Sequence, residues 1–174
     1  MKLPEPADDF VVRLDDLLPR LTGLAQLDPP TRLTDPDPDT GERWEWAQIW
    51  SHMVEFIPYW RGQIDRIREA EPEEDPVPFG RVKTDPERLA RIEQGRTVAF
   101  SEVWEGFQEE FGHLKAYLGG LSEEEWRRRG AHPTLGIMGM DRIVDRFLVG
   151  HLEEHVEQLE SLTDGPSRER PATG

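Results

Sequence analysis

Apolar residues recur at helical spacing in four stretches of the chain, covering residues 7–27, 44–70, 85–118 and 140–162. In each stretch they fall three or four positions apart, which places them on one face of a helix and leaves the charged residues on the other. No run of alternating apolar and polar residues lasts long enough to indicate a sheet strand. The pattern therefore predicts an all-α chain built on four long amphipathic helices.

The segments between these helices are rich in proline, glycine and acidic residues, so we expect loops there. The connection into the last helix is expected to be a long loop with one short helical turn, because Ser122 and Glu125 form a capping-box pair. Four helices in 174 residues predict one antiparallel four-helix bundle domain over residues 1–163. The polar residues 164–174 are expected to form a disordered tail.

The chain is strongly acidic, with a formal net charge of −15. Its basic residues are scattered or paired with acids, so the sequence argues against binding to nucleic acid or to an anionic membrane face. It holds no apolar run of about 18 residues that would cross a membrane, and its first residues lack the apolar core of a signal peptide. We therefore expect a cytoplasmic protein whose partner is a small-molecule substrate.

The chain contains no cysteine. This composition excludes disulfides, thiolate metal sites, iron–sulfur clusters and a cysteine nucleophile. Any metal ion must therefore be held by nitrogen and oxygen ligands. Any thiol chemistry requires a thiol that comes from outside the chain.

The last helix carries two of the five histidines, His151 and His155, on its apolar face. Residues four apart are neighbours on a helix, so the two imidazoles are predicted to lie side by side in the bundle interior. Buried imidazoles are costly unless they form hydrogen bonds or bind a ligand. The two rings therefore either pack as satisfied core residues or share a metal ion. His52, at the edge of the apolar face of the second helix, is the candidate third ligand.

The segment HLEEH also fits the His-x-x-Glu-His pattern of inverted zinc peptidases, in which Glu154 would be the base. Those enzymes take a third ligand well downstream, whereas only 19 residues follow His155 and none of them starts another substantial element. On a helical wheel, Glu154 also points away from the direction expected for an ion beside His155. We therefore set the peptidase interpretation aside.

Three segments, in order along the chain, resemble the DinB/YfiT-like superfamily of metal-binding helical bundles, which includes the mycothiol-dependent maleylpyruvate isomerase type. They are WAQIWSHMVEFIPYW with its single histidine, LSEEEWRRRGAHPTLGIMGM with its His-Pro-x-x-Gly turn, and DRFLVGHLEEHVEQL with its paired histidines. The resemblance implies a DinB-like bundle with a divalent metal ion, zinc or nickel, held by His52, His151 and His155. It also implies a homodimer and a low-molecular-weight thiol as cosubstrate.

These observations favour a metal-dependent enzyme whose three-histidine site activates a small thiol or a water molecule. The reaction would then be thiol S-transfer, isomerisation through a thiol adduct, or hydrolysis. The first alternative is a non-catalytic metal-binding stress or regulatory protein of the same fold. The second alternative is a plain helical dimer whose histidines pack without a metal ion.

Other polar residues near the three histidines are secondary candidates. Glu55, one turn beyond His52, is the candidate catalytic residue: it orients a ligand imidazole or acts as a base, unless it is a solvated surface acid. Tyr59 either donates a hydrogen bond to a bound substrate or packs in the core. His132 is expected to cap a turn rather than reach the site. Arg146 either attracts a substrate carboxylate or lies in solvent.

Overall fold

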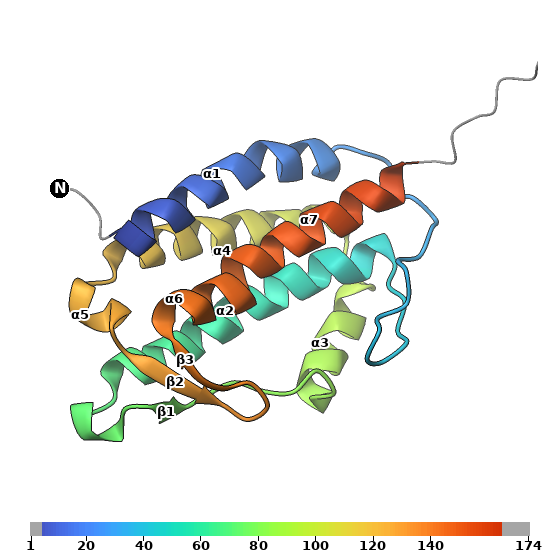
Figure 1. Ribbon diagram of the computed structural model, residues 1–174. Coiled ribbons are helices and arrows are strands. Elements are labelled where there is room, and N and C mark those ends of the chain that lie inside the picture. Colours follow the sequence, from blue (N-terminus) through green and yellow to red (C-terminus); the bar gives the residue numbers. More distant parts are fainter. Residues whose placement is uncertain (1–4, 165–174) are drawn as a thin grey trace, which may run out of the picture.

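The structure of the chain, a computed structural model, describes residues 5–164 and is mainly helical (Figure 1). The expected disordered tail, residues 164–174, lies outside this described part except for Asp164. Among residues 5–164, no helix is long and apolar enough to cross a membrane. Four long helices form the body of the fold: α1 (Glu5–Ala25), α2 (Trp46–Glu69), α4 (Phe100–Gly120) and α7 (Gly150–Thr163).

The last helix of the bundle is built from three consecutive segments, α6 (Met140–Val144), the π-helical turn η2 (Asp145–Val149) and α7. In the π-helical turn, the Gly150 N–H donates to the Asp145 carbonyl oxygen five residues back. A Cβ at Gly150 would lie 2.6 Å from that oxygen. Glycine at this position therefore permits the wider turn, directly before His151.

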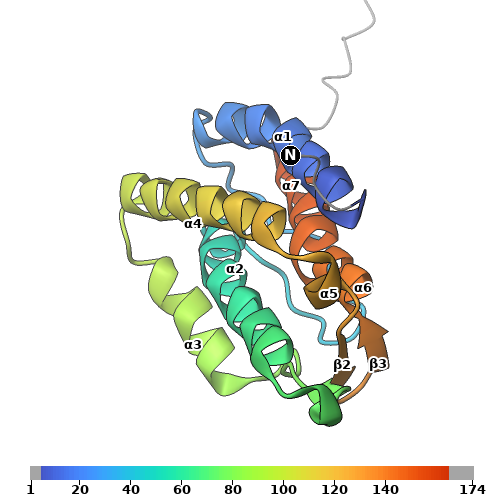
Figure 2. The same cartoon turned by 90° about the vertical axis from the view of Figure 1, so that its left-hand side faces the viewer.

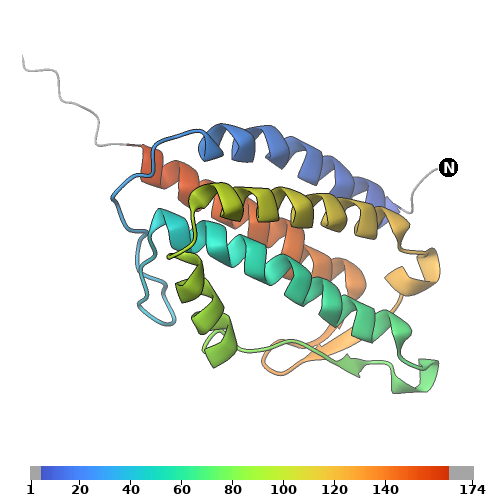
Figure 3. The same cartoon turned by 180° about the vertical axis from the view of Figure 1, so that it is seen from behind.

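The third expected helix, residues 85–118, is interrupted in the structure at the segment EQGRT, where Gly95 weakens the apolar pattern of the sequence. The structure divides it into α3 (Pro86–Gly95) and α4, which are joined by a short turn. α3 lies beside α2, as the view from behind shows (Figure 3). A Cβ at Gly95 would lie 2.1 Å from the Ser51 Oγ of α2. The glycine that interrupts the apolar pattern is therefore a point of close contact between two helices.

The expectation of an all-α chain is wrong in one region, where a small sheet of order β1-β2-β3 lies. β1 (Val77–Pro78) pairs in parallel with β2 (Arg129–His132), which pairs antiparallel with β3 (Gly136–Gly139). Strands of two to four residues are too short for an alternating pattern to stand out in the sequence. The expected helical turn before the last helix is present as α5 (Glu123–Trp126), with Ser122 as its cap.

The four long helices do not alternate in direction, so the predicted antiparallel arrangement is wrong for two pairs. α1 and α7 run one way, whereas α2 and α4 run the other way (Figures 1 and 2). Ion pairs from Arg13 to Glu153 and from Arg20 to Glu160 show α1 and α7 advancing together. The connection over residues 70–99 is long enough to carry the chain back along α2 before α4 begins, so these two helices are parallel.

Aromatic side chains fill the interior between α2 and α4. The fully buried Trp50 lies edge-on to Trp104 and Phe107, with ring centroids 5.6 and 5.4 Å apart. The side of α2 that faces α7 differs, because the histidines His52 and His155 are buried there among apolar residues. The interface between α2 and α7 is therefore a part of the core that contains buried polar side chains.

Replacing Gly95 with alanine is expected to destabilise the fold by about 1–3 kcal/mol, because the new Cβ would lie 2.3 Å from the Ser51 Cβ. Gly112→Ala in α4 is the matched control. A Cβ at Gly112 meets nothing within 4 Å, so this change is expected to stabilise the fold by about 0.5–1 kcal/mol. Urea titration measures the free energies of unfolding. A Gly95→Ala protein as stable as the parent chain would contradict the packing of α3 on α2.

Candidate metal centre

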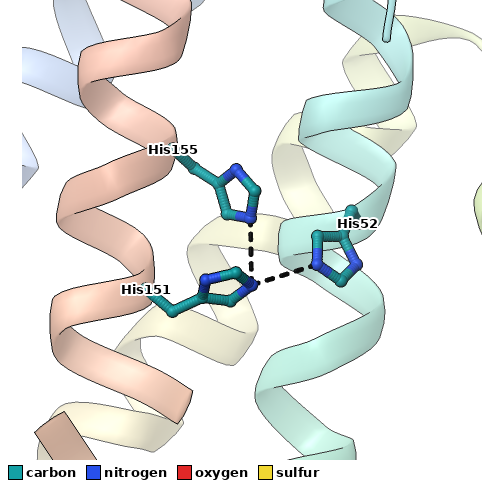
Figure 4. Close-up of side chains that lie close together, drawn as sticks. All are labelled: His52, His151 and His155. Atoms are coloured by element: carbon teal, nitrogen blue, oxygen red, sulfur yellow. Dashed lines mark hydrogen bonds between the residues drawn. The ribbon is translucent and has the colours of Figure 1, made fainter. Parts of the chain in front are cut away.

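Three histidines meet where α2 passes α7 (Figure 4). His151 Nε2 lies 3.2 Å from His52 Nε2 and 3.1 Å from His155 Nε2. His52 comes from α2, and the other two residues lie on successive turns of α7. One ligand nitrogen of each ring lies within 4.8 Å of the other two. The structure thus brings together the three residues that the sequence suggested as metal ligands.

Each of the three imidazoles has an oxygen acceptor next to its Nδ1, three residues further along the same helix. The contacts are His52–Glu55 at 3.5 Å, His151–Glu154 at 3.2 Å and His155–Gln158 at 2.8 Å. Carboxylate and amide oxygens can only accept, so the contacts of His151 and His155 place the ring proton on Nδ1, whereas the buried Nδ1 of His52 forms no hydrogen bond. The Nε2 atoms of His151 and His155 are then left without protons.

The three Nε2 atoms fit the donor set of a metal ion. Without protons, the Nε2 atoms of His151 and His155 present lone pairs to each other, and lone pairs 3.1 Å apart repel unless a cation lies between them. A tetrahedral zinc ion with nitrogen ligands at 2.0–2.1 Å holds those nitrogens about 3.3 Å apart. The separations of the imidazoles therefore match the coordination of a divalent ion.

Burial keeps two of the three rings neutral. His52 and His155 are each 3% exposed. Burial lowers the pKa of both imidazoles well below its ordinary value, and the neighbouring histidines lower it further by charge repulsion. His151 is partly exposed. The fold thus selects the neutral form of the buried rings, which is the form that binds metal ions.

Glu55, the candidate catalytic residue, is buried, so its interpretation as a solvated surface acid is wrong. Arg81 Nη2 donates to both of its carboxylate oxygens, at 2.5 and 2.7 Å. The Arg81 guanidinium also lies over the Tyr59 ring, 3.7 Å from its centroid. Glu55 is thus held between Arg81 and His52, which favours a role in orienting the imidazole over that of a free base.

A cleft of about 900 Å³ opens beside the three histidines. The loop of residues 34–44 forms one wall, and the β2–β3 hairpin with Phe147 lies on another side. Trp44 connects the loop to the centre, because its ring stacks on His155 at 6.1 Å and meets His52 edge-on at 5.0 Å. The volume is that of a site for a small molecule, with direct access to His151.

His132 caps a turn, as expected, and it lines the cleft as well. Its Nδ1 accepts hydrogen bonds from the backbone N–H groups of Thr134 and Leu135, both at 3.3 Å. The ring is buried against Phe147, with centroids 5.1 Å apart, and burial lowers the pKa of His132. Arg146 lines the same cleft from an exposed position on its rim.

Two residues that contact the histidines were not predicted from the sequence to do so. Gln158 was not considered, and Glu154 was considered only as the base of a peptidase. The available signal was a carboxylate or amide three residues after each histidine, the spacing that brings two side chains onto the same helix face.

No protein-family model and no curated protein matches the sequence. Among solved structures, the chain is similar to YfiT from Bacillus subtilis, described as "a probable metal-dependent hydrolase with an unusual four-helix bundle topology". The two share 19% sequence identity, and the match has a TM-score of 0.67 over 94% of this chain and 89% of that chain. The chain therefore has the fold of YfiT, in agreement with the resemblance that the sequence motifs suggested.

Replacing Gln158 with alanine removes the acceptor that orients the His155 ring, so we expect the affinity for a divalent ion to fall about tenfold. Competition for Zn²⁺ with a chromogenic chelator measures that affinity. Glu157→Ala, on the exposed face of the same helix, is the matched control and should bind Zn²⁺ like the parent chain. Equal affinities in all three proteins would show that Gln158 does not support the centre.

Proposed function

We propose that the protein is a metal-dependent enzyme, with hydrolysis of a small substrate as the first candidate reaction. The observation that carries this proposal is the convergence of three Nε2 atoms beside a cleft of small-molecule size. The fold similarity to YfiT, itself described as a probable metal-dependent hydrolase, supports the hydrolytic reaction.

The three imidazoles would hold zinc or nickel, which both suit nitrogen ligands. A divalent ion with three neutral ligands keeps open positions and lowers the pKa of a water molecule or thiol there towards neutrality. His151 is partly exposed to the cleft, so a small molecule can approach the centre from its side. Trp44 and Phe147 supply apolar walls that limit the access of bulk water.

A small thiol is the alternative nucleophile at the same centre. The chain has no cysteine, so such a thiol must be a cosubstrate of low molecular weight, of the mycothiol kind. A cleft of about 900 Å³ is large enough for a small thiol together with its electrophile. The reaction would then be S-transfer or isomerisation through a thiol adduct instead of hydrolysis.

A non-catalytic metal-binding protein of the stress or regulatory type is the second candidate function. Closed structural metal sites usually surround the ion with four protein ligands. Among residues 5–164, three ligand side chains converge here, and a cleft lies beside them. This open arrangement favours the enzyme over the non-catalytic protein.

The parent chain, purified without a histidine tag, is expected to contain about one divalent ion per chain by elemental analysis. His151→Ala is expected to lose most of that metal, because two imidazoles remain. His113→Ala is the matched control, since His113 is exposed on α4 and should not affect the metal content. A parent chain that neither retains nor takes up a divalent ion would overturn both metal-based functions.

A panel of small esters and amides, tested with and without a small thiol, separates the candidate reactions. We expect turnover by the metal-loaded parent and by His113→Ala, and a loss of at least about a hundredfold in His151→Ala. Turnover that needs no thiol supports hydrolysis, whereas turnover that requires one supports thiol transfer. Metal binding without turnover across the whole panel would support the non-catalytic function.

A further inference from the structure

Arg88 is a half-buried cation on the wall of the cleft. It lies in the first turn of α3, and its guanidinium carbon is 5.5 Å from the centroid of the Trp44 ring. Trp44 in turn stacks on His155 and meets His52 edge-on. The guanidinium therefore lies one aromatic ring away from the three-histidine centre.

Among the cations that line the cleft, Arg88 is the half-buried one that has no carboxylate partner at short range. Two of the others are paired: Arg81 with Glu55, and Lys83 with Asp37 and Asp39. Within the described part of the chain, no carboxylate oxygen lies within 4.0 Å of the Arg88 guanidinium. Its Nη1 donates to the Lys83 carbonyl oxygen at 2.8 Å, which leaves several N–H donors free. Arg146 is exposed on the rim.

An unpaired guanidinium in this position carries a cost in free energy. Burial lowers the pKa of Arg88, and the positive charge of Arg81 lowers it further. Glu55 of α2, and Glu42 and Asp37 of the loop, attract the guanidinium without reaching ion-pair distance. A neutral residue would avoid this cost, so the charge calls for a partner that enters the cleft from solution.

We propose that Arg88 binds an oxyanionic group of the substrate, a carboxylate or a phosphate, and makes the cleft selective for small anionic molecules. The planar guanidinium offers paired N–H donors that match both groups. The rings of Trp44, Trp60 and Phe147 line the same cleft and suit an aromatic or apolar body. This assignment rests on the proposed function, because it names the substrate class of the same site.

Three probes that share a phenyl ring test the proposal by calorimetry: benzoate, phenyl phosphate and the neutral benzamide. We expect at least one of the anions to bind about ten times more tightly than benzamide, because only the anions form charge-assisted bonds. The titrations are made with metal-loaded protein and with chelator-treated protein. The preference is expected in both forms, since Arg88 and not the ion supplies it. The order of benzoate and phenyl phosphate distinguishes a carboxylate site from a phosphate site.

Substitutions assign the preference to Arg88. Arg88→Gln is expected to bind the anions about tenfold more weakly, with unchanged affinity for benzamide and unchanged metal content. Arg88→Lys keeps the charge without the paired donors, so its affinity should be intermediate. Arg91→Gln is the matched control, because Arg91 is exposed on the same helix and pairs with Glu87. It should bind all three probes like the parent chain.

Equal affinity of the parent chain for the anions and for benzamide would overturn the proposal, and this comparison needs no variant. Equal anion binding by Arg88→Gln and Arg91→Gln would overturn it too. So would a loss of metal from Arg88→Gln, which would assign Arg88 a structural role. A chain that takes up no divalent ion but still prefers the anions would contradict the proposed metal-dependent enzyme. It would support the anion site at Arg88.

Discussion

Three imidazoles, confined between α2 and α7 with their Nε2 atoms facing one another, impose the main constraint on this structure. His151 and His155 cannot form a hydrogen bond with each other while the proton of each ring is held on Nδ1. The surrounding groups all act on ring orientation: Gln158 holds one ring, Arg81 fixes the carboxylate of Glu55 beside another, and Trp44 packs against two. Their arrangement is explained by the need to keep three Nε2 atoms aimed at one point.

The path of the chain explains how rings from distant positions meet. The segment with β1 and α3 returns the chain to the starting end of α2, so α4 runs parallel to it. The last helix then packs antiparallel to α2, since Trp60 contacts Phe147 of η2 whereas the earlier His52 contacts the later His155 of α7. The cleft forms along this interface because the loop of residues 34–44 and the β2–β3 hairpin border it.

The sequence predicted the long helices and the three histidines because both lie on long apolar stripes, where helical spacing accumulates over many residues. Helix directions were not predictable in this way, because they depend on the path of the connections and not on any stripe. The sheet escaped detection because strands of two to four residues show no alternation. Trp44 and Arg88 were not predicted as site residues, because Trp44 ends a loop and Arg88 lies in the first turn of a short helix. Glu55 was found from its spacing to His52, and the structure places it against that ring.

The ion pairs that hold the two walls of the cleft differ in their exposure to solvent. On the α7 side, Arg13 of α1 forms two hydrogen bonds with Glu153, and their side chains are 28% and 33% exposed. On the loop side, Lys83 bridges to Asp39 with side chains that are 52% and 71% exposed, so dissolved salt screens their attraction. The contacts that hold the loop wall are therefore weakened by salt more than those that hold α7.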